Sequence, residues 1–130
     1  DGDSNTINDV YTSNCDCVGT PVRSGQGRYA AQPSNIPGTI QAEYYDNGGQ
    51  GIAFNDNGSR NGNNFRAEDN VDIGDLSGSN YKIGWTANGE WLEYTVDVAA
   101  GTYDMLLTAS SGYNGGGNVG GVQVTLGGQN

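Results

Sequence analysis

Apolar and polar residues alternate most clearly over residues 90–98, EWLEYTVDV. Residues at every second position of an extended chain lie on the same face of a strand. One face of this segment carries Leu92, Tyr94, Val96 and Val98. The other carries Trp91, Glu93, Thr95 and Asp97. The pattern therefore predicts a strand whose apolar face lines a core.

Four shorter segments have the composition of strands and are separated by loops rich in Gly and Asn. They are TIQAEYY at 39–45, VDIGDL at 71–76, YDMLLTAS at 103–110 and VQVTL at 122–126. Gly makes up 23 of the 130 residues, and long blocks of helix-forming residues are missing. This composition favours an all-β fold of short strands joined by turns.

The first 35 residues lack this alternation and contain the turn-forming Pro21 and Pro33. We interpret residues 1–35 as an irregular, acidic, Cys-containing linker and residues 36–130 as one β-sandwich domain. The last predicted strand is followed only by GGQN, so the second arm of a hairpin does not follow. A length of about 95 residues is short for a β-sandwich domain whose last hairpin is unfinished, and we expect the domain to be incomplete at its C-terminus.

The charge of the chain narrows its possible partners. Fifteen acidic residues stand against five basic ones, the net charge is −10, and histidine is absent. Binding to nucleic acid needs clustered Lys and Arg, so it is not expected. The apolar runs are too short to cross a bilayer. Cations and neutral polar molecules are the expected ligands.

Cys15 and Cys17 are the two cysteines of the chain. Without histidine or further cysteines a zinc site is not expected, and a disulfide in a secreted protein is the better interpretation. Cysteines this close rarely bridge each other comfortably. Their pairing stays open, and one partner is expected to precede Asp1.

The acidic start of the chain has two interpretations. Alternate positions carry the oxygen side chains of Asp1, Asp3, Asn5 and Asp9, as in a calcium-binding loop. Thr12 stands where such a loop has a bidentate acid, so the alternative is a solvated acidic turn. The pattern DGD, NDVY and CDCVG also resembles connectors between modules of secreted Bacteroidetes proteins.

Enzyme chemistry has little support in the sequence. Glu90 and Glu93 are too close in the chain to flank a glycosidic bond, and they point to opposite faces of a strand. Phosphate-loop, dinucleotide and nucleophile-elbow patterns are absent. The chain is predicted to be non-catalytic.

Three blocks, IPGTIQAEYYDNGGQGIAFND, NNFRAEDNVDI and YKIGWTANGEWLEYTVDVAAGTYDMLLTAS, follow one another in an order and spacing similar to the family 6 carbohydrate-binding modules. The resemblance covers residues 36–130. It implies a jelly-roll β-sandwich with a structural calcium, secreted as part of a polysaccharide-degrading enzyme. The expected ligand is a polysaccharide of the β-glucan, xylan or agarose class.

The resemblance also implies roles for individual residues. Gln41 and Glu43 match the side-chain ligands of the structural calcium, Phe65 matches the ring that stacks on a sugar, and Gln50 matches a polar position at the edge of the same cleft. Replacing Phe65 by Ala is expected to abolish binding with little change in melting temperature. The other cleft residues of the family would fall after Asn130.

Loop residues Asn64, Trp85 and Tyr113 complete the predicted carbohydrate-binding set, because amides and rings suit the hydroxyls and C–H faces of sugars. Trp91 is expected to be a framework residue, and a structural role is also favoured for Trp85. An alternative function is an extracellular assembly protein that completes its sandwich with strands of a neighbouring chain, as a homo-oligomer.

Overall fold

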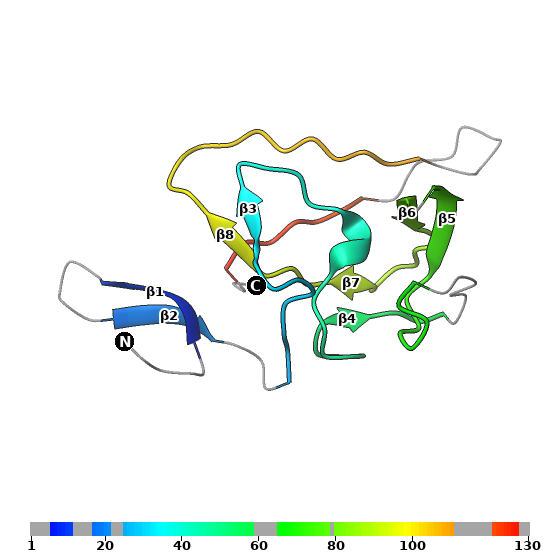
Figure 1. The fold of residues 1–130 in the computed structure, drawn as a ribbon, viewed down its shortest axis with the longest axis horizontal. Coiled ribbons are helices and arrows are strands. Elements are labelled where there is room, and N and C mark those ends of the chain that lie inside the picture. Colours follow the sequence, from blue (N-terminus) through cyan, green and yellow to red (C-terminus); the bar gives the residue numbers. More distant parts are fainter. Residues whose placement is uncertain are drawn as a thin grey trace. The chain divides into compact units, whose positions relative to one another are not determined.

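The computed structural model describes residues 6–11, 17–21, 25–58, 65–78, 80–110 and 121–127 (Figure 1). The chain divides into two compact units, Asp1–Ala99 and Ala100–Asn130. Strands make up the regular structure of the described residues, apart from one short 3-10 helix. The predicted all-β class is therefore confirmed.

In the described residues, eight short strands and the 3-10 helix follow one another. They are β1 (Thr6–Tyr11), β2 (Cys17–Pro21), β3 (Ser34–Ile36), η1 (Ala42–Tyr44), β4 (Phe54–Asn55), β5 (Ile73–Ser77), β6 (Asn80–Ile83), β7 (Trp91–Leu92) and β8 (Val96–Val98). The strands form four two-stranded sheets, β1–β2, β3–β8, β4–β7 and β5–β6. The β3–β8 pair is parallel and the other three pairs are antiparallel.

An antiparallel hairpin lies within the segment that the sequence predicts to be a linker. Thr6 of β1 is opposite Pro21 of β2, and Tyr11 is opposite Cys17. The register shifts between Ile7 and Val10, as at a β-bulge. Because a bulge breaks the two-residue period, alternation along the sequence gives a weak signal for this hairpin.

Residues 25–36, also in or next to the predicted linker, are bonded to the core unit. Gly27 and Asn47 exchange two backbone hydrogen bonds, with N to O distances of 2.8 and 2.6 Å. The Gln26 Nε2 donates to Asp46 Oδ2 at 2.7 Å. Strand β3 then pairs with β8 (Figure 1). The folded unit thus includes residues before the predicted boundary at Ile36.

The segment TIQAEYY forms a 3-10 turn where a strand was predicted. The Tyr44 amide donates to the Gln41 carbonyl at 3.0 Å, which closes the turn. Because the chain curls here, Tyr44 points outward while the next two residues, Tyr45 and Asp46, are buried.

The predicted strand over residues 90–98 is divided into β7 and β8. Between them the Glu93 amide donates to the Ala53 carbonyl at 2.9 Å, so this part of the chain bonds to a loop. Leu92 and Tyr94 pack against the core, as the alternation predicts. Val98 is exposed, and its predicted place in the core is wrong.

The core consists of the buried side chains Tyr45, Ala53, Phe54, Val71 and Ile73. The Tyr45 and Phe54 rings meet edge to face, with centroids 5.5 Å apart. This arrangement is the favoured geometry for a pair of aromatic rings. The core lies where β4, β5 and the chain after η1 come together.

Arg66 braces this core from one side. Its side chain is 7% exposed and its Nε forms an ion pair with Asp69 Oδ2 at 2.8 Å. The guanidinium donates to the carbonyls of Tyr45 and Asp46 and to Asn47 Oδ1. The central carbon of the guanidinium, Arg66 Cζ, also lies 3.6 Å from the centroid of the Tyr45 ring. One cation thus bonds the backbone carbonyls of two consecutive residues and the side chain of the next.

The second unit is described at residues 100–110 and 121–127, which form no sheet ladder. Strands predicted over 103–110 and 122–126 are therefore not formed there. Their apolar side chains are exposed: Met105, Leu106, Leu107, Val122, Val124 and Leu126. A strand needs a neighbouring strand for its backbone groups, and no described strand pairs with these two segments. No helix of the described residues has the length and apolar character of a membrane span.

Candidate functional site

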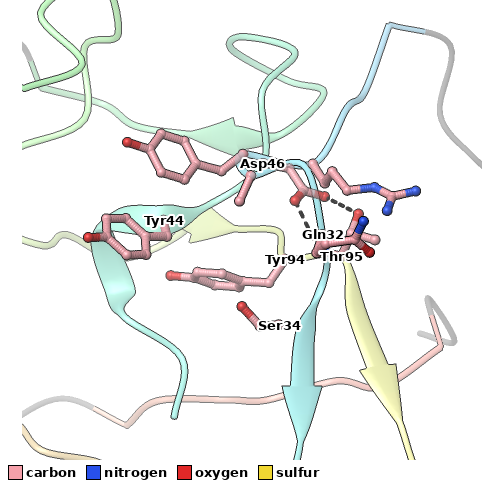
Figure 2. A pocket seen from close by; sticks show the side chains of 9 residues that line it. Gln32, Ser34, Tyr44, Asp46, Tyr94 and Thr95 are labelled. Carbon is pink, nitrogen blue, oxygen red and sulfur yellow. Dashed lines mark hydrogen bonds between the residues drawn. The ribbon is translucent and has the colours of Figure 1, made fainter. Parts of the chain in front are cut away.

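A shallow pocket opens beside the 3-10 turn, between β3 and the segment that precedes β8 (Figure 2). Six of its lining residues are Gln32, Ser34, Tyr44, Asp46, Tyr94 and Thr95. Its volume of about 40 Å³ is room for a few water molecules. A ligand larger than this would rest on the pocket rather than be enclosed by it.

One side of the pocket is aromatic. Tyr44, 43% exposed, stacks on Tyr29 with ring centroids 4.9 Å apart and an interplanar angle of 12°. Phe65 lies 6.0 Å from the Tyr29 ring and stacks on Tyr81 at 4.4 Å. The four rings form a continuous aromatic row, and Tyr44 is its exposed member at the pocket.

The opposite side is polar. Asp46 is buried, and its carboxylate accepts from the Thr95 amide at 2.9 Å and from Thr95 Oγ1 at 2.7 Å (Figure 2). These bonds, with that from Gln26, satisfy the buried charge. No hydrogen bond from a described residue engages the side chains of Gln32 and Ser34. Their amide and hydroxyl can therefore bond a ligand without breaking a hydrogen bond to the described part of the chain.

Tyr94 joins the two sides. Its hydroxyl donates to the Ala42 carbonyl at 2.8 Å. Burial raises the pKa of the Tyr94 phenol, and the nearby Glu43 carboxylate raises that pKa further. Burial is also the main cause that raises the pKa of Tyr45 in the core. Both phenols are therefore neutral hydrogen-bond donors at physiological pH.

These raised pKa values predict a loss of stability in alkali. A phenol in the unfolded chain ionises near pH 10, below the pKa that Tyr45 and Tyr94 have in the folded protein. Their contribution to stability is fully present below about pH 10 and is lost as the pH rises through the folded pKa. We expect melting temperatures measured from pH 8 to 11.5 to be flat and then to fall. Y94F should fall less steeply than the wild type, and equal slopes would contradict the assignment.

Phe65, the predicted stacking residue, is half-buried and packs against the core. Since its ring already stacks on Tyr81, replacement would leave a gap beside that ring. We therefore expect F65A to lower the free energy of unfolding by about 1–3 kcal/mol. This differs from the unchanged melting temperature that the sequence led us to expect. Denaturant unfolding of F65A beside F65L, which keeps most of the volume, measures the effect.

Gln50 is exposed, but its amide is engaged inside its own loop. Its Nε2 donates to Asn55 Oδ1 at 2.9 Å and to the Asp56 carbonyl at 3.0 Å. Its Oε1 accepts from the Asp56 amide at 3.1 Å. These bonds hold the turn that precedes β4 and use the groups that a ligand would need.

The two tryptophans differ in their surroundings. Trp91 is half-buried in β7, where it pairs with Asn55 of β4. Trp85 is 58% exposed and has a positive φ of 49°. This left-handed backbone costs an L-residue about 1–2 kcal/mol. The favoured structural role suits Trp91 better than Trp85.

The described residues among the predicted calcium ligands differ in their exposure. Gln41 is exposed, whereas Glu43 is 5% exposed. Asp9 falls in strand β1. The described part of the chain holds no group of three or more acidic, Cys or His side chains suited to a metal ion. Five predicted site residues lie outside the described residues: Asp1, Asp3, Asn5, Asn64 and Tyr113.

The sequence interpretation missed Tyr29, Tyr44 and Gln32 as site residues. Tyr29 and Gln32 lie in RYAAQP, which reads as linker because of its small residues and Pro33. The available signal was a tyrosine in a segment otherwise poor in large side chains. Tyr44 was predicted to lie in a strand, where alternate side chains point to opposite faces and nothing distinguishes this tyrosine as a site residue.

The chain was compared with protein-family models, with curated proteins and with solved structures, and none of the three comparisons finds a match.

Proposed function

We propose that this protein is a non-catalytic carbohydrate-binding module. The observation that carries the proposal is the pocket with the exposed Tyr44 ring on one side and Gln32 and Ser34 on the other, whose side chains form no hydrogen bond with a described residue. The proposal rests on the fit between these groups and a sugar.

A pyranose ring presents two kinds of surface. Its C–H face is weakly apolar and packs on an aromatic ring, while its hydroxyls need donors and acceptors in the plane of the sugar. Tyr44 provides the ring, and its stacking on Tyr29 fixes that ring in place. Gln32 offers both a donor and an acceptor. The pocket is too small to enclose a sugar, so the ligand is a chain that lies across it, such as a polysaccharide.

The wider context follows from the resemblance to the family 6 modules. We propose that the four two-stranded ladders belong to a jelly-roll β-sandwich and that the protein is secreted with a polysaccharide-degrading enzyme. A second attachment point of this kind raises the local concentration of the enzyme on an insoluble polymer. The net charge of −10 suits neutral glycans of the β-glucan, xylan or agarose class.

Calorimetric titration with soluble β-glucan, xylan and agarose oligosaccharides tests the proposal. We expect heat of binding with at least one of the three classes. The protein should first be shown to be folded by near-ultraviolet circular dichroism. Absence of heat with all three from folded protein would contradict the function.

Calcium is the proposed structural ion, with Glu43 as its side-chain ligand. Glu43 is 5% exposed. A buried carboxylate is stabilised by positive charge, and a calcium ion with oxygen ligands would supply that charge. We expect added calcium to raise the melting temperature of the wild type and to leave that of E43Q unchanged. An equal response of the two proteins would contradict this ligand.

A second candidate function is assembly through strand exchange with a second copy of this chain. It is favoured by the exposed apolar side chains of residues 105–107 and 122–126, which have strand composition but no ladder partner among the described residues. Pairing between copies would cover them. Light scattering coupled to size exclusion should then report a dimer or larger species. A monomer at high protein concentration would rule this out.

A further inference from the structure

Trp85 is a large aromatic side chain that the folded structure leaves mostly exposed. It is 58% exposed although burial of an indole is among the largest apolar gains a side chain can make. Its backbone is also held in the left-handed region, with φ of 49°. A strained conformation that keeps a large ring in solvent suggests that the ring has a ligand.

Neighbouring residues determine where the Trp85 ring lies. An ideal Cβ placed on Gly74 of β5 would lie 3.6 Å from Trp85 Cζ3 and 2.9 Å from Lys82 Cε. Glycine at this position thus leaves room for both side chains over the strand. The Lys82 ammonium lies 6.0 Å from the centroid of the indole. The Gly84 amide, which donates to the Asp72 carbonyl at 2.8 Å, anchors the backbone just before the tryptophan.

We propose that Trp85 forms a second saccharide-contact surface, separate from the pocket. Trp85 is not among the residues that line the pocket. An exposed indole is a flat platform for the C–H face of a sugar, and Lys82 beside it can donate to ring or hydroxyl oxygens. The class of ligand rests on the proposed function, whereas the surface itself rests on the exposure, strain and packing of Trp85.

Two contact surfaces on one module have a measurable consequence. A long polysaccharide occupies both, so its apparent affinity exceeds that of a trisaccharide, which occupies one. We expect W85N to weaken binding of the polymer by roughly tenfold to a hundredfold. The same variant should bind the trisaccharide at the pocket as the wild type does. Since Asn tolerates a left-handed backbone, its melting temperature should not fall.

The test uses soluble β-glucan, xylan and agarose as polymers and as their trisaccharides. The matched control is L76A. Leu76 is an apolar side chain on β5 that is 55% exposed, which is close to the 58% exposure of Trp85. L76A should bind each polymer like the wild type. Acrylamide quenching of tryptophan fluorescence gives a direct readout, because the chain has two tryptophans and W85F removes the exposed one. Polymer should protect the wild type from quenching and leave W85F unaffected.

The outcomes separate the two proposals. If a polymer binds, W85N binds it like the wild type and quenching does not change, the Trp85 surface is ruled out while the carbohydrate-binding function stands. If no polymer or trisaccharide binds to the folded protein, both the proposed function and the assignment of a saccharide ligand to Trp85 are contradicted. Weaker polymer binding by W85N, with L76A unchanged, supports the second surface.

Discussion

R66A is expected to lower the free energy of unfolding by about 3–5 kcal/mol. Removal of the guanidinium removes its ion pair with the Asp69 carboxylate and its hydrogen bonds to the Tyr45 and Asp46 carbonyls. A buried carbonyl that loses its donor costs more than the bond itself contributes. Because small domains have a total stability of about 5–15 kcal/mol, this loss would be a large fraction of the total. Denaturant titration followed by near-ultraviolet circular dichroism measures the change.

Arg28 provides the matched control for this experiment. It is exposed, and none of the described residues forms an ion pair with it. We expect R28A to change the free energy of unfolding by less than about 0.5 kcal/mol. Similar stabilities for R66A and R28A would show that the network around Arg66 does not brace the core.

Y44A is expected to weaken polysaccharide binding by roughly 30-fold, which corresponds to about 2 kcal/mol. Tyr44 is the exposed ring of the aromatic row, and its loss removes the surface on which the sugar would rest. Y44F should keep most of the affinity, because the ring and not the hydroxyl provides the stacking surface. Calorimetric titration of both variants with the ligand of the wild type gives the comparison.

Tyr103 is a suitable control, since it is 39% exposed and does not line the pocket. Y103A should bind as the wild type does. Loss of affinity in Y103A equal to that in Y44A would indicate a general loss of fold rather than of a contact. Unchanged affinity in Y44A would remove the pocket from the proposed function.

Residues whose environment is set by their immediate neighbours were predictable. Leu92 and Tyr94 pack on the core because alternation places them on one face, and Val71 and Ile73 are buried for the same reason. The 3-10 turn after Gln41 was not predictable, because strand-type composition describes Tyr44 and Tyr45 equally well in a turn. What decides between the two is tertiary: Arg66, far along the chain, bonds the Tyr45 carbonyl.

The candidate site shows the same division. An aromatic ring and polar loop groups were expected, but Phe65 lies against Tyr81 and the Gln50 amide is used inside its loop. The pocket instead combines Tyr29 and Tyr44, two segments that become neighbours only after folding. The segment that contains Tyr29 was predicted to be a linker from its composition. A segment that packs only against distant residues shows no periodic pattern of apolar residues.

The parallel pairing of β3 with β8 also determines when this part of the protein can fold during synthesis on the ribosome. Ser34 meets Val96 and Ile36 meets Val98, so β3 leaves the exit tunnel well before its partner has been synthesised. At ~5–20 residues per second, the interval is on the order of several seconds. Throughout that time the nascent chain carries Tyr29 and Tyr44 without the wall that Tyr94 and Thr95 complete. The pocket is thus a late product of translation.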